Sequence, residues 1–174
     1  MPETRRIESS EVQRAIESLA TAVRNQHEKG DRLLLLGIAN GGIELARRLK
    51  AFLPRASLGT VDISFHRDDI GRNPIPKEFA PTQIPGDVNG ARVVLVDDVL
   101  FSGRTVKAAL DELFDHGRPA KVELAILVDR GGRLLPFAAD FCGLTLETLP
   151  REKVVVSLDA SDSTKDYISV RSPS

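Results

Sequence analysis

The chain has 174 residues, a net charge of −1, 41% hydrophobic residues and 28% charged residues. Such a composition is typical of one folded domain, and it excludes a polycation that would bind DNA through its overall charge. No secretory signal and no apolar run long enough for a membrane span stands out. We therefore expect a single cytoplasmic domain over residues 1–174 with no membrane partner. The single cysteine, Cys142, permits no internal disulfide, and we interpret it as a small buried apolar residue.

The first part of the chain predicts a helix followed by a buried strand. The helix is expected to begin near Ser9 and to end at Gly30, because an apolar stripe with helical spacing lies between them. Residues 33–38 form a short continuous apolar run, which is typical of a strand buried on both faces. The stripe consists of Val12, Ile16, Leu19 and Val23.

A glycine-rich loop, Asn40-Gly41-Gly42, connects this strand to a helix predicted over residues 43–53. A helix N-terminus after such a loop offers free backbone N–H groups and a partial positive charge, so the junction is a possible anion site. A plain turn between a strand and a helix is the alternative interpretation, because the pattern is weak on its own.

Residues 60–65 alternate polar and apolar side chains, which predicts a strand with one exposed face. Residues 66–69, which read His-Arg-Asp-Asp, follow it, and residues 71–89 contain four prolines. A loop of this length inside a compact domain is usually functional. From the residues alone we would interpret 67–69 as a solvated charge cluster, and His66 as a surface histidine and not as a general base.

The clearest motif in the chain covers residues 93–105. Residues 93–96 are apolar and predict a buried parallel strand, which ends at two carboxylates, Asp97 and Asp98. A short loop then leads into an amphipathic helix that ends near Gly117. The helix N-terminus and the loop hydroxyls would hold a phosphate, while the carboxylates would accept hydrogen bonds from ribose hydroxyls. The motif predicts recognition of a ribose 5-phosphate, and a capped helix after a buried strand is the alternative.

Further strands follow this motif. Residues 121–128 predict a strand with Asp129-Arg130-Gly131-Gly132 at its carboxyl end, where ligands gather in open parallel sheets, although a simple turn is the alternative. Residues 154–158 predict a final core strand, and residues 167–170 predict an edge strand. Residues 171–174 are expected to form a frayed tail.

These motifs resemble a known family. Residues 93–105 are similar to the motif with which type I phosphoribosyltransferases bind phosphoribosyl pyrophosphate (PRPP). From about Ile7 to Leu158 the chain resembles the PyrR family, which combines pyrimidine operon attenuation with uracil phosphoribosyltransferase activity. The resemblance implies an α/β fold with an open, mostly parallel sheet flanked by helices, a flexible lid over residues 66–90 and a small hood that covers the base. Besides the motif, it lies in Phe65-His66-Arg67-Asp68-Asp69, Leu110–Pro119, Leu127–Gly131 and Glu152–Val154.

The resemblance also implies roles for individual residues. Asn40, Gly41 and Gly42 would bind the pyrophosphate of PRPP, although many PyrR proteins have Thr-Arg where this chain has Asn40-Gly41. Arg67 would reach the substrate when the lid closes. The base would be contacted by Val128, Asp129, Arg130 and Val154. The ribose and its phosphate would be bound by Asp97, Asp98, Val99, Leu100, Phe101, Ser102, Gly103, Arg104 and Thr105.

The activity implied is transfer of the phosphoribosyl group from PRPP to uracil, which yields UMP and pyrophosphate. Asp97, Asp98 and Arg67 would be the catalytic residues. Mg²⁺ would arrive with PRPP and be held largely by substrate oxygens and water, and we expect no metal site of histidines and cysteines. Relatives assemble, so we expect a homodimer or a larger homo-oligomer.

Two alternatives stay open. One is an attenuator that senses UMP or PRPP and binds pyrimidine operon mRNA, with weak or no enzymatic activity. Gly132 stands where family attenuators carry a histidine, and residues 135–138 lack their basic side chain, which argues against this alternative. The other is transfer to a purine, against which the Val-Asp-Arg-Gly sequence argues. The candidate RNA contacts are Arg47, Arg48, Arg118, Arg130 and Arg133.

Overall fold

The structure, a computed structural model, describes residues 2–27, 32–68 and 81–173. None of the helices in these ranges has both the length and the apolar character that a membrane crossing needs. The helices are α1 (Ser9–Gln26), α2 (Gly41–Phe52) and α3 (Arg104–Asp115), with a short 3₁₀ helix at Ser163–Lys165. The strands are β1 (Glu3–Glu8), β2 (Leu33–Ile38), β3 (Ser57–Val61), β4 (Arg92–Leu100), β5 (Lys121–Asp129), β6 (Phe141–Thr145), β7 (Lys153–Ser157) and β8 (Tyr167–Arg171).

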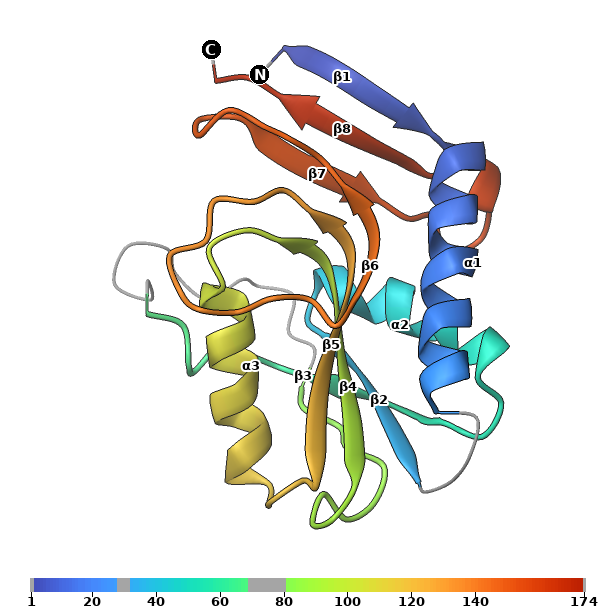
Figure 1. Cartoon of the computed structure of the whole chain (residues 1–174), viewed down its shortest axis with the longest axis vertical. Helices are drawn as coiled ribbons and strands as arrows, with labels where there is room; N and C mark the ends of the chain where they lie inside the picture. Colours follow the sequence, from blue (N-terminus) through green and yellow to red (C-terminus); the bar gives the residue numbers. More distant parts are fainter. Residues whose placement is uncertain (1, 28–31, 69–80, 174) are drawn as a thin grey trace.

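Five parallel strands form the main sheet in the order β3-β2-β4-β5-β6. Helices α1 and α2 cover one face of this sheet and α3 covers the other (Figure 1). Leu35 of β2 lies in the apolar cluster under α1 and α2, whereas Leu34 and Leu36 lie in the cluster under α3. Because both faces are covered, the central strands are continuously apolar, as the sequence predicts.

The order of the strands reverses between β2 and β4. From β2 the chain passes through α2 to β3 on one side, and from β4 it passes through α3 to β5 on the other. In open parallel sheets, ligands bind at the carboxyl ends of the strands beside such a reversal. The loops that follow β2 and β4, residues 39–40 and 101–103, therefore flank the favoured position for a ligand.

A second, antiparallel sheet with the order β1-β8-β7 lies beyond the carboxyl ends of the main strands (Figure 1). It is the predicted hood, and both ends of the chain contribute to it. The strand predicted at 154–158 is present as β7 and Val154 is buried in the core, but β7 belongs to this second sheet and not to the main one. The prediction of an edge strand at 167–170 is wrong, because β1 pairs with β8 and makes it central. Most residues of β1 are charged or exposed, so the sequence carries no apolar signal for this strand.

Three smaller expectations from the sequence are wrong as well. β3 spans residues 57–61 instead of 60–65, because the Asp62 carboxylate accepts hydrogen bonds from the N–H and the hydroxyl of Ser64 and turns the chain. Cys142 is exposed and not buried, because it lies on the edge strand β6. The tail is not frayed at its start, because β8 includes Arg171 and the N–H of Ser172 donates to the chain's other end.

A buried ion pair joins the second sheet to the helices of the main layer. Asp166, just before β8, has a side chain with 0% exposure, and it pairs with Arg48 of α2. The Asp166 carboxylate also accepts a hydrogen bond from the N–H of Asp159 at 2.8 Å, and Arg48 donates to the Asp159 carbonyl oxygen at 2.6 Å. Gln13 of α1 donates to the same carboxylate. Both charges are therefore satisfied by partners from several segments.

We expect Asp166→Asn to lower the free energy of unfolding by about 3 kcal/mol, because it removes one partner of a buried charge pair. Denaturant unfolding followed by circular dichroism measures this change. Asp111→Asn is the matched control, since Asp111 pairs with Lys107 on the surface of α3 and such pairs contribute at most about 1 kcal/mol. Equal losses of unfolding free energy in the two variants would contradict the conclusion that the Asp166–Arg48 pair stabilises the attachment of the second sheet.

Candidate functional site

The N-terminus of α2 lies directly against β4. A Cβ atom on Gly42 would lie 2.0 Å from the carbonyl oxygen of Val96, and one on Gly41 would lie 2.6 Å from a carboxylate oxygen of Asp98. At Gly42 only glycine permits so close an approach to the backbone, whereas at Gly41 the neighbour is a side chain that could move. The glycines form the first turn of α2, which begins at residue 41 and not at 43 as predicted, and the exposed Asn40 precedes them. The predicted anion loop is thus in contact with the predicted ribose-binding carboxylates.

β4 is longer than the sequence predicts, since it continues through Asp97 and Asp98 to Leu100. Asp97 is buried, and one of its carboxylate oxygens accepts a hydrogen bond from the N–H of Asp98 at 3.0 Å. Burial raises the pKa of Asp97 well above its ordinary value, and the neighbouring Asp98 charge raises it further. Burial raises the pKa of Asp98 too. The pair concentrates negative charge that hydroxyl donors or a cation would stabilise.

α3 begins beside this pair, after a left-handed residue. Gly103 has a φ of 92°, which glycine adopts without strain, and the ring of Phe137 and the side chain of Leu135 fill the space beside it. The Ser102 hydroxyl accepts a hydrogen bond from the N–H of Arg104 at 3.3 Å. The other N–H groups of the first turn have no acceptor within the helix, so together with the helix dipole they are suited to an anion, as the sequence predicts.

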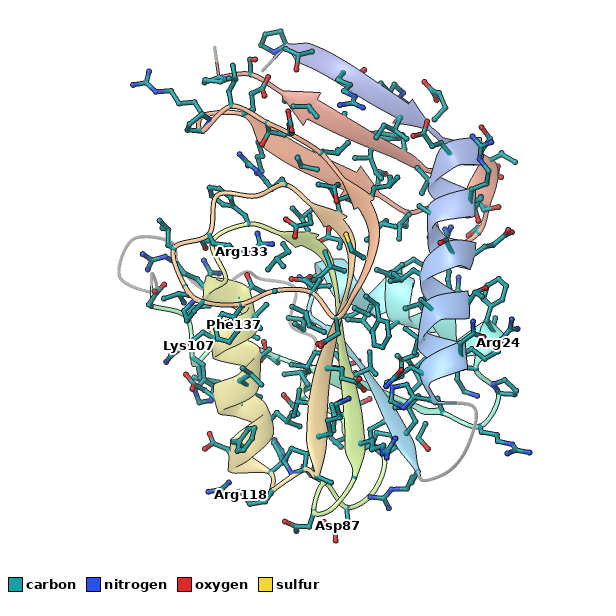
Figure 2. The ribbon with its side chains drawn as sticks, viewed as in Figure 1. Arg24, Asp87, Lys107, Arg118, Arg133 and Phe137 are labelled. Carbon is teal, nitrogen blue, oxygen red and sulfur yellow. The ribbon has the colours of Figure 1, made fainter. Side chains whose placement is uncertain are left out.

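Arg133 fastens the loop after β5 to the end of β4. Its guanidinium pairs with Asp129 and donates to the carbonyl oxygens of Phe101 at 2.8 Å and Phe137 at 2.9 Å. Figure 2 shows Arg133 and Phe137 near the N-terminal end of α3. Sequence reasoning assigns Arg133 only as a candidate RNA contact. It misses this role because the Phe101 carbonyl is 32 residues away in the chain and carries no side-chain signal.

Arg130, which is predicted to contact a base, has only 9% of its surface exposed. Its guanidinium carbon lies 4.1 Å from the centroid of the Phe101 ring, and it donates to Thr148 and Leu149. Burial lowers the pKa of Arg130. A Cβ atom on Gly132 would lie 2.5 Å from the same ring. Family attenuators carry a histidine at position 132. Such a side chain would collide with the Phe101 ring in its present position, so the ring would have to move.

The remaining predicted site residues are less exposed to a ligand. Val128 and Val154 are buried in one apolar cluster, so their side chains belong to the core. Arg67 is half-buried on a segment that Asp68 ties to α3 through an ion pair with the first residue of the helix. Residues 69–80, the central part of the predicted lid, lie outside the described residues.

Three strand ends thus carry the residues predicted from the sequence. Asn40–Gly42 follow β2, residues 97–105 lie at and after the end of β4, and residues 129–130 lie at the end of β5. These strands are neighbours or next neighbours in the sheet. Two helix N-termini flank a pair of carboxylates, an arrangement suited to a polyol that carries two separate anionic groups.

Gly42→Ala is expected to lower the free energy of unfolding by about 1–3 kcal/mol, because the added methyl group would overlap the Val96 carbonyl. Denaturant unfolding measures this loss. Gly90→Asn is the control, since Gly90 has a φ of 69° with open space around it and asparagine tolerates that conformation. If the two variants were equally stable, the close contact between α2 and β4 would be disproved.

Asp97→Asn is expected to stabilise the fold at neutral pH. Because the folded-state pKa is raised, the folded chain binds more protons than the unfolded chain above the ordinary pKa, and stability falls as the pH rises through that window. Asparagine keeps the acceptor for the Asp98 N–H but has no charge. The Tm advantage of the variant should grow as the pH rises above about 4, the ordinary pKa of an aspartate, by roughly 2–4 °C for each kcal/mol gained. A variant that melts below the parent chain at neutral pH would contradict this.

The sequence matches the phosphoribosyl transferase domain family over residues 6–160. It is 41% identical to the bifunctional protein PyrR of Geobacter sulfurreducens, an alignment that covers 93% of this chain and 94% of that protein. It is 46% identical to the bifunctional protein PyrR of Streptomyces coelicolor, where the alignment covers 90% of this chain and 83% of that protein.

Among solved structures, a hypoxanthine-guanine phosphoribosyltransferase from Bacillus anthracis is similar to this chain with a TM-score of 0.69. The identity is 18%, and 98% of this chain and 100% of that chain are covered, so the similarity shows a shared fold alone. The predicted fold class, an open and mostly parallel sheet flanked by helices with a hood, is confirmed. The family match spans all three strand ends of the site. The chain therefore belongs to the type I phosphoribosyltransferases and, among them, to the PyrR family.

Proposed function

We propose that this protein is a uracil phosphoribosyltransferase, which transfers the phosphoribosyl group of PRPP to N1 of uracil and releases pyrophosphate. The observation that carries the proposal is the contact between the first turn of α2 and Asp98, beside the reversal in strand order. It supports the proposal because PRPP has a phosphate, two free hydroxyls and a pyrophosphate. These groups need two anion sites with acceptors between them.

Each part of the site would bind one part of PRPP. The first turn of α3, with its loop hydroxyls, would bind the 5-phosphate through N–H groups and the helix dipole. Asp97 and Asp98 would accept hydrogen bonds from the two ribose hydroxyls. Their negative charge would also stabilise the cationic, oxocarbenium-like sugar of the transition state. The N–H groups of Gly41 and Gly42 would bind the pyrophosphate.

Phosphoribosyltransferases generally use Mg²⁺ together with PRPP. The donor set fits this ion, because Mg²⁺ prefers oxygen ligands and two adjacent carboxylates, Asp97 and Asp98, lie near the end of β4. These carboxylates would hold it through substrate oxygens and water. When bound, such an ion would supply positive charge that offsets the charge of the pyrophosphate leaving group.

Uracil is the base that membership in the PyrR family favours. Val128 and Asp129 would contribute backbone groups, Arg130 would contact the base edge, and Val154 would support it from the core. The bond from uracil N1 to C1 of the ribose forms as the bond from C1 to the pyrophosphate oxygen breaks. The bonding electrons leave with pyrophosphate and the N1 proton passes to solvent. Arg67 would reach the substrate, and orientation and charge stabilisation would supply the rate acceleration.

Asp98→Asn is expected to lower kcat/KM for PRPP by about 100-fold or more, as is usual when one group that stabilises transition-state charge is removed. Steady-state formation of UMP from uracil and PRPP with Mg²⁺ measures the change. Asp87→Asn is the control, because Asp87 is exposed at the opposite end of the molecule (Figure 2). Unchanged kinetics in Asp98→Asn would remove the ribose-binding role.

A panel of bases tests the acceptor. We expect turnover with uracil to exceed that with hypoxanthine, guanine or orotate by at least about 100-fold, because polar recognition of a base edge discriminates strongly. A preference for a purine would overturn the assignment of uracil as the acceptor, while the proposal of phosphoribosyl transfer would stand. The similarity to the purine enzyme does not favour that outcome, since 18% identity shows the fold alone.

A second function is binding of pyrimidine operon mRNA in response to UMP. It is favoured because the relatives are named bifunctional PyrR proteins, and the PyrR family combines attenuation with the transferase activity. The arginines considered from the sequence do not form a free basic face. Gel shifts of the operon leader RNA with and without UMP test the function, and no shift at micromolar protein would reject it. The arginines are engaged as follows: Arg47 by Glu44, Arg48 by Asp166, Arg118 by the Phe114 carbonyl, Arg130 by Phe101 and Arg133 by Asp129.

A further inference from the structure

Three side chains that commonly bind metal ions converge beside α3. The Nε2 atom of His66 lies 3.0 Å from Oε2 of Glu112 and 3.3 Å from Oδ2 of Asp115. One ligand atom from each residue lies within 4.8 Å of the other two. His66 and Glu112 are 46 residues apart in the chain, so no spacing motif could reveal the cluster, and the sequence predicts no metal ligands there.

These separations fit the coordination shell of a small divalent cation. In a tetrahedral Zn²⁺ site with bonds of about 2.0–2.1 Å, neighbouring ligand atoms lie about 3.3 Å apart. The distances from His66 Nε2 to the two carboxylate oxygens, 3.0 and 3.3 Å, agree with this value. One imidazole nitrogen and two carboxylate oxygens would leave the fourth position for water.

Contacts around Glu112 hold its carboxylate in the orientation that such a site needs. Its other oxygen, Oε1, accepts a hydrogen bond from the Thr82 hydroxyl at 2.7 Å and lies 3.2 Å from Nε2 of His116. Oε2 is thereby directed toward His66. Metal ligands are commonly oriented by such outer contacts. The Asp115 side chain is 69% exposed, so an ion could enter from solvent.

We propose that His66, Glu112 and Asp115 bind a divalent transition metal ion of the Zn²⁺ type. The imidazole ligand favours Zn²⁺ over Mg²⁺, so the site is separate from the Mg²⁺ that PRPP carries. Asp115 is also the last residue of α3, where the partial negative charge of the helix favours a cation. The proposal is independent of the proposed reaction, because none of the ligands belongs to residues 97–105.

The bound ion would fasten the segment at residues 62–68 to the C-terminal end of α3. The same segment is already tied to the N-terminal end of α3 by the ion pair between Asp68 and Arg104. Both of those side chains are more than half exposed, so this pair alone contributes little. The metal would therefore supply the stronger of the two attachments, and Arg67 lies on the segment between them.

Isothermal titration calorimetry of the metal-free protein with ZnCl₂, in millimolar MgCl₂, tests the site. We expect one Zn²⁺ per chain, and a loss of affinity of about tenfold or more in His66→Asn and in Asp115→Asn. Asp115→Asn is the safeguard against misfolding, because its side chain is largely exposed. Asp111→Asn on the same helix and Cys142→Ser, which removes an exposed thiol, are expected to bind Zn²⁺ as the parent chain does.

A second readout separates binding at this site from binding elsewhere. Zn²⁺ should raise the Tm of the parent chain and of both controls, but not that of His66→Asn or Asp115→Asn. The absence of Zn²⁺ binding, or unchanged affinity in both ligand variants, would overturn the proposal. Loss of binding in Cys142→Ser would assign the metal to the cysteine and overturn it equally.

Discussion

The close approach of α2 to β4 is the constraint on which the rest of the site depends. Gly42 brings the first turn of the helix against the Val96 carbonyl, where any side chain would collide. Right-handed crossovers in a parallel sheet direct the N-termini of α2 and α3 to the same edge, and the reversal in strand order separates the two helices onto opposite faces. The free N–H groups of both helices therefore lie at the edge of the sheet where β4 carries Asp97 and Asp98, shortly before its end. The geometry of this edge follows from the packing of three backbone segments more than from any single side chain.

Two buried aspartates in this fold show how stability and ligand binding make opposite demands. Asp166 is buried together with Arg48 and several hydrogen-bond donors, so its charge joins two parts of the molecule. Asp97 is buried beside another carboxylate, which raises its pKa and makes its ionised form unfavourable. A fold selected for stability alone would not keep that pair. The pair lies between two helix N-termini, which is consistent with charge that is retained for a ligand. Carboxylates with strongly perturbed pKa values are concentrated at functional sites.

Local patterns in the sequence predict the strands and loops that depend on contiguous residues. They fail for features that depend on contacts between distant segments. The apolar runs at residues 33–38 and 93–96 identify the central strands, and the motif at 97–105 identifies the loop at the edge of the sheet, because each depends on contiguous residues. β1 and β6 escape detection because their stability comes from pairing with β8 and β5, and not from an apolar pattern of their own. The connecting role of Arg133 is hidden for the same reason, since its acceptors are mostly backbone carbonyls.

The glycine at position 41 and the carboxylate of Asp98 are coupled, and this coupling bears on the departure from the family pattern. Many PyrR proteins have an arginine where this chain has Gly41, and an arginine–phosphate hydrogen bond contributes about 1.5–3 kcal/mol. Here a Cβ atom at position 41 would lie 2.6 Å from Asp98 Oδ1, so an arginine could be accommodated only if that carboxylate moved. This chain therefore lacks the guanidinium at position 41, and in its absence the N-terminus of α2 lies closer to the Asp98 carboxylate. Gly41→Arg alone would displace the Asp98 carboxylate, and under the proposed function a gain in pyrophosphate affinity would require Asp98 to adopt another rotamer.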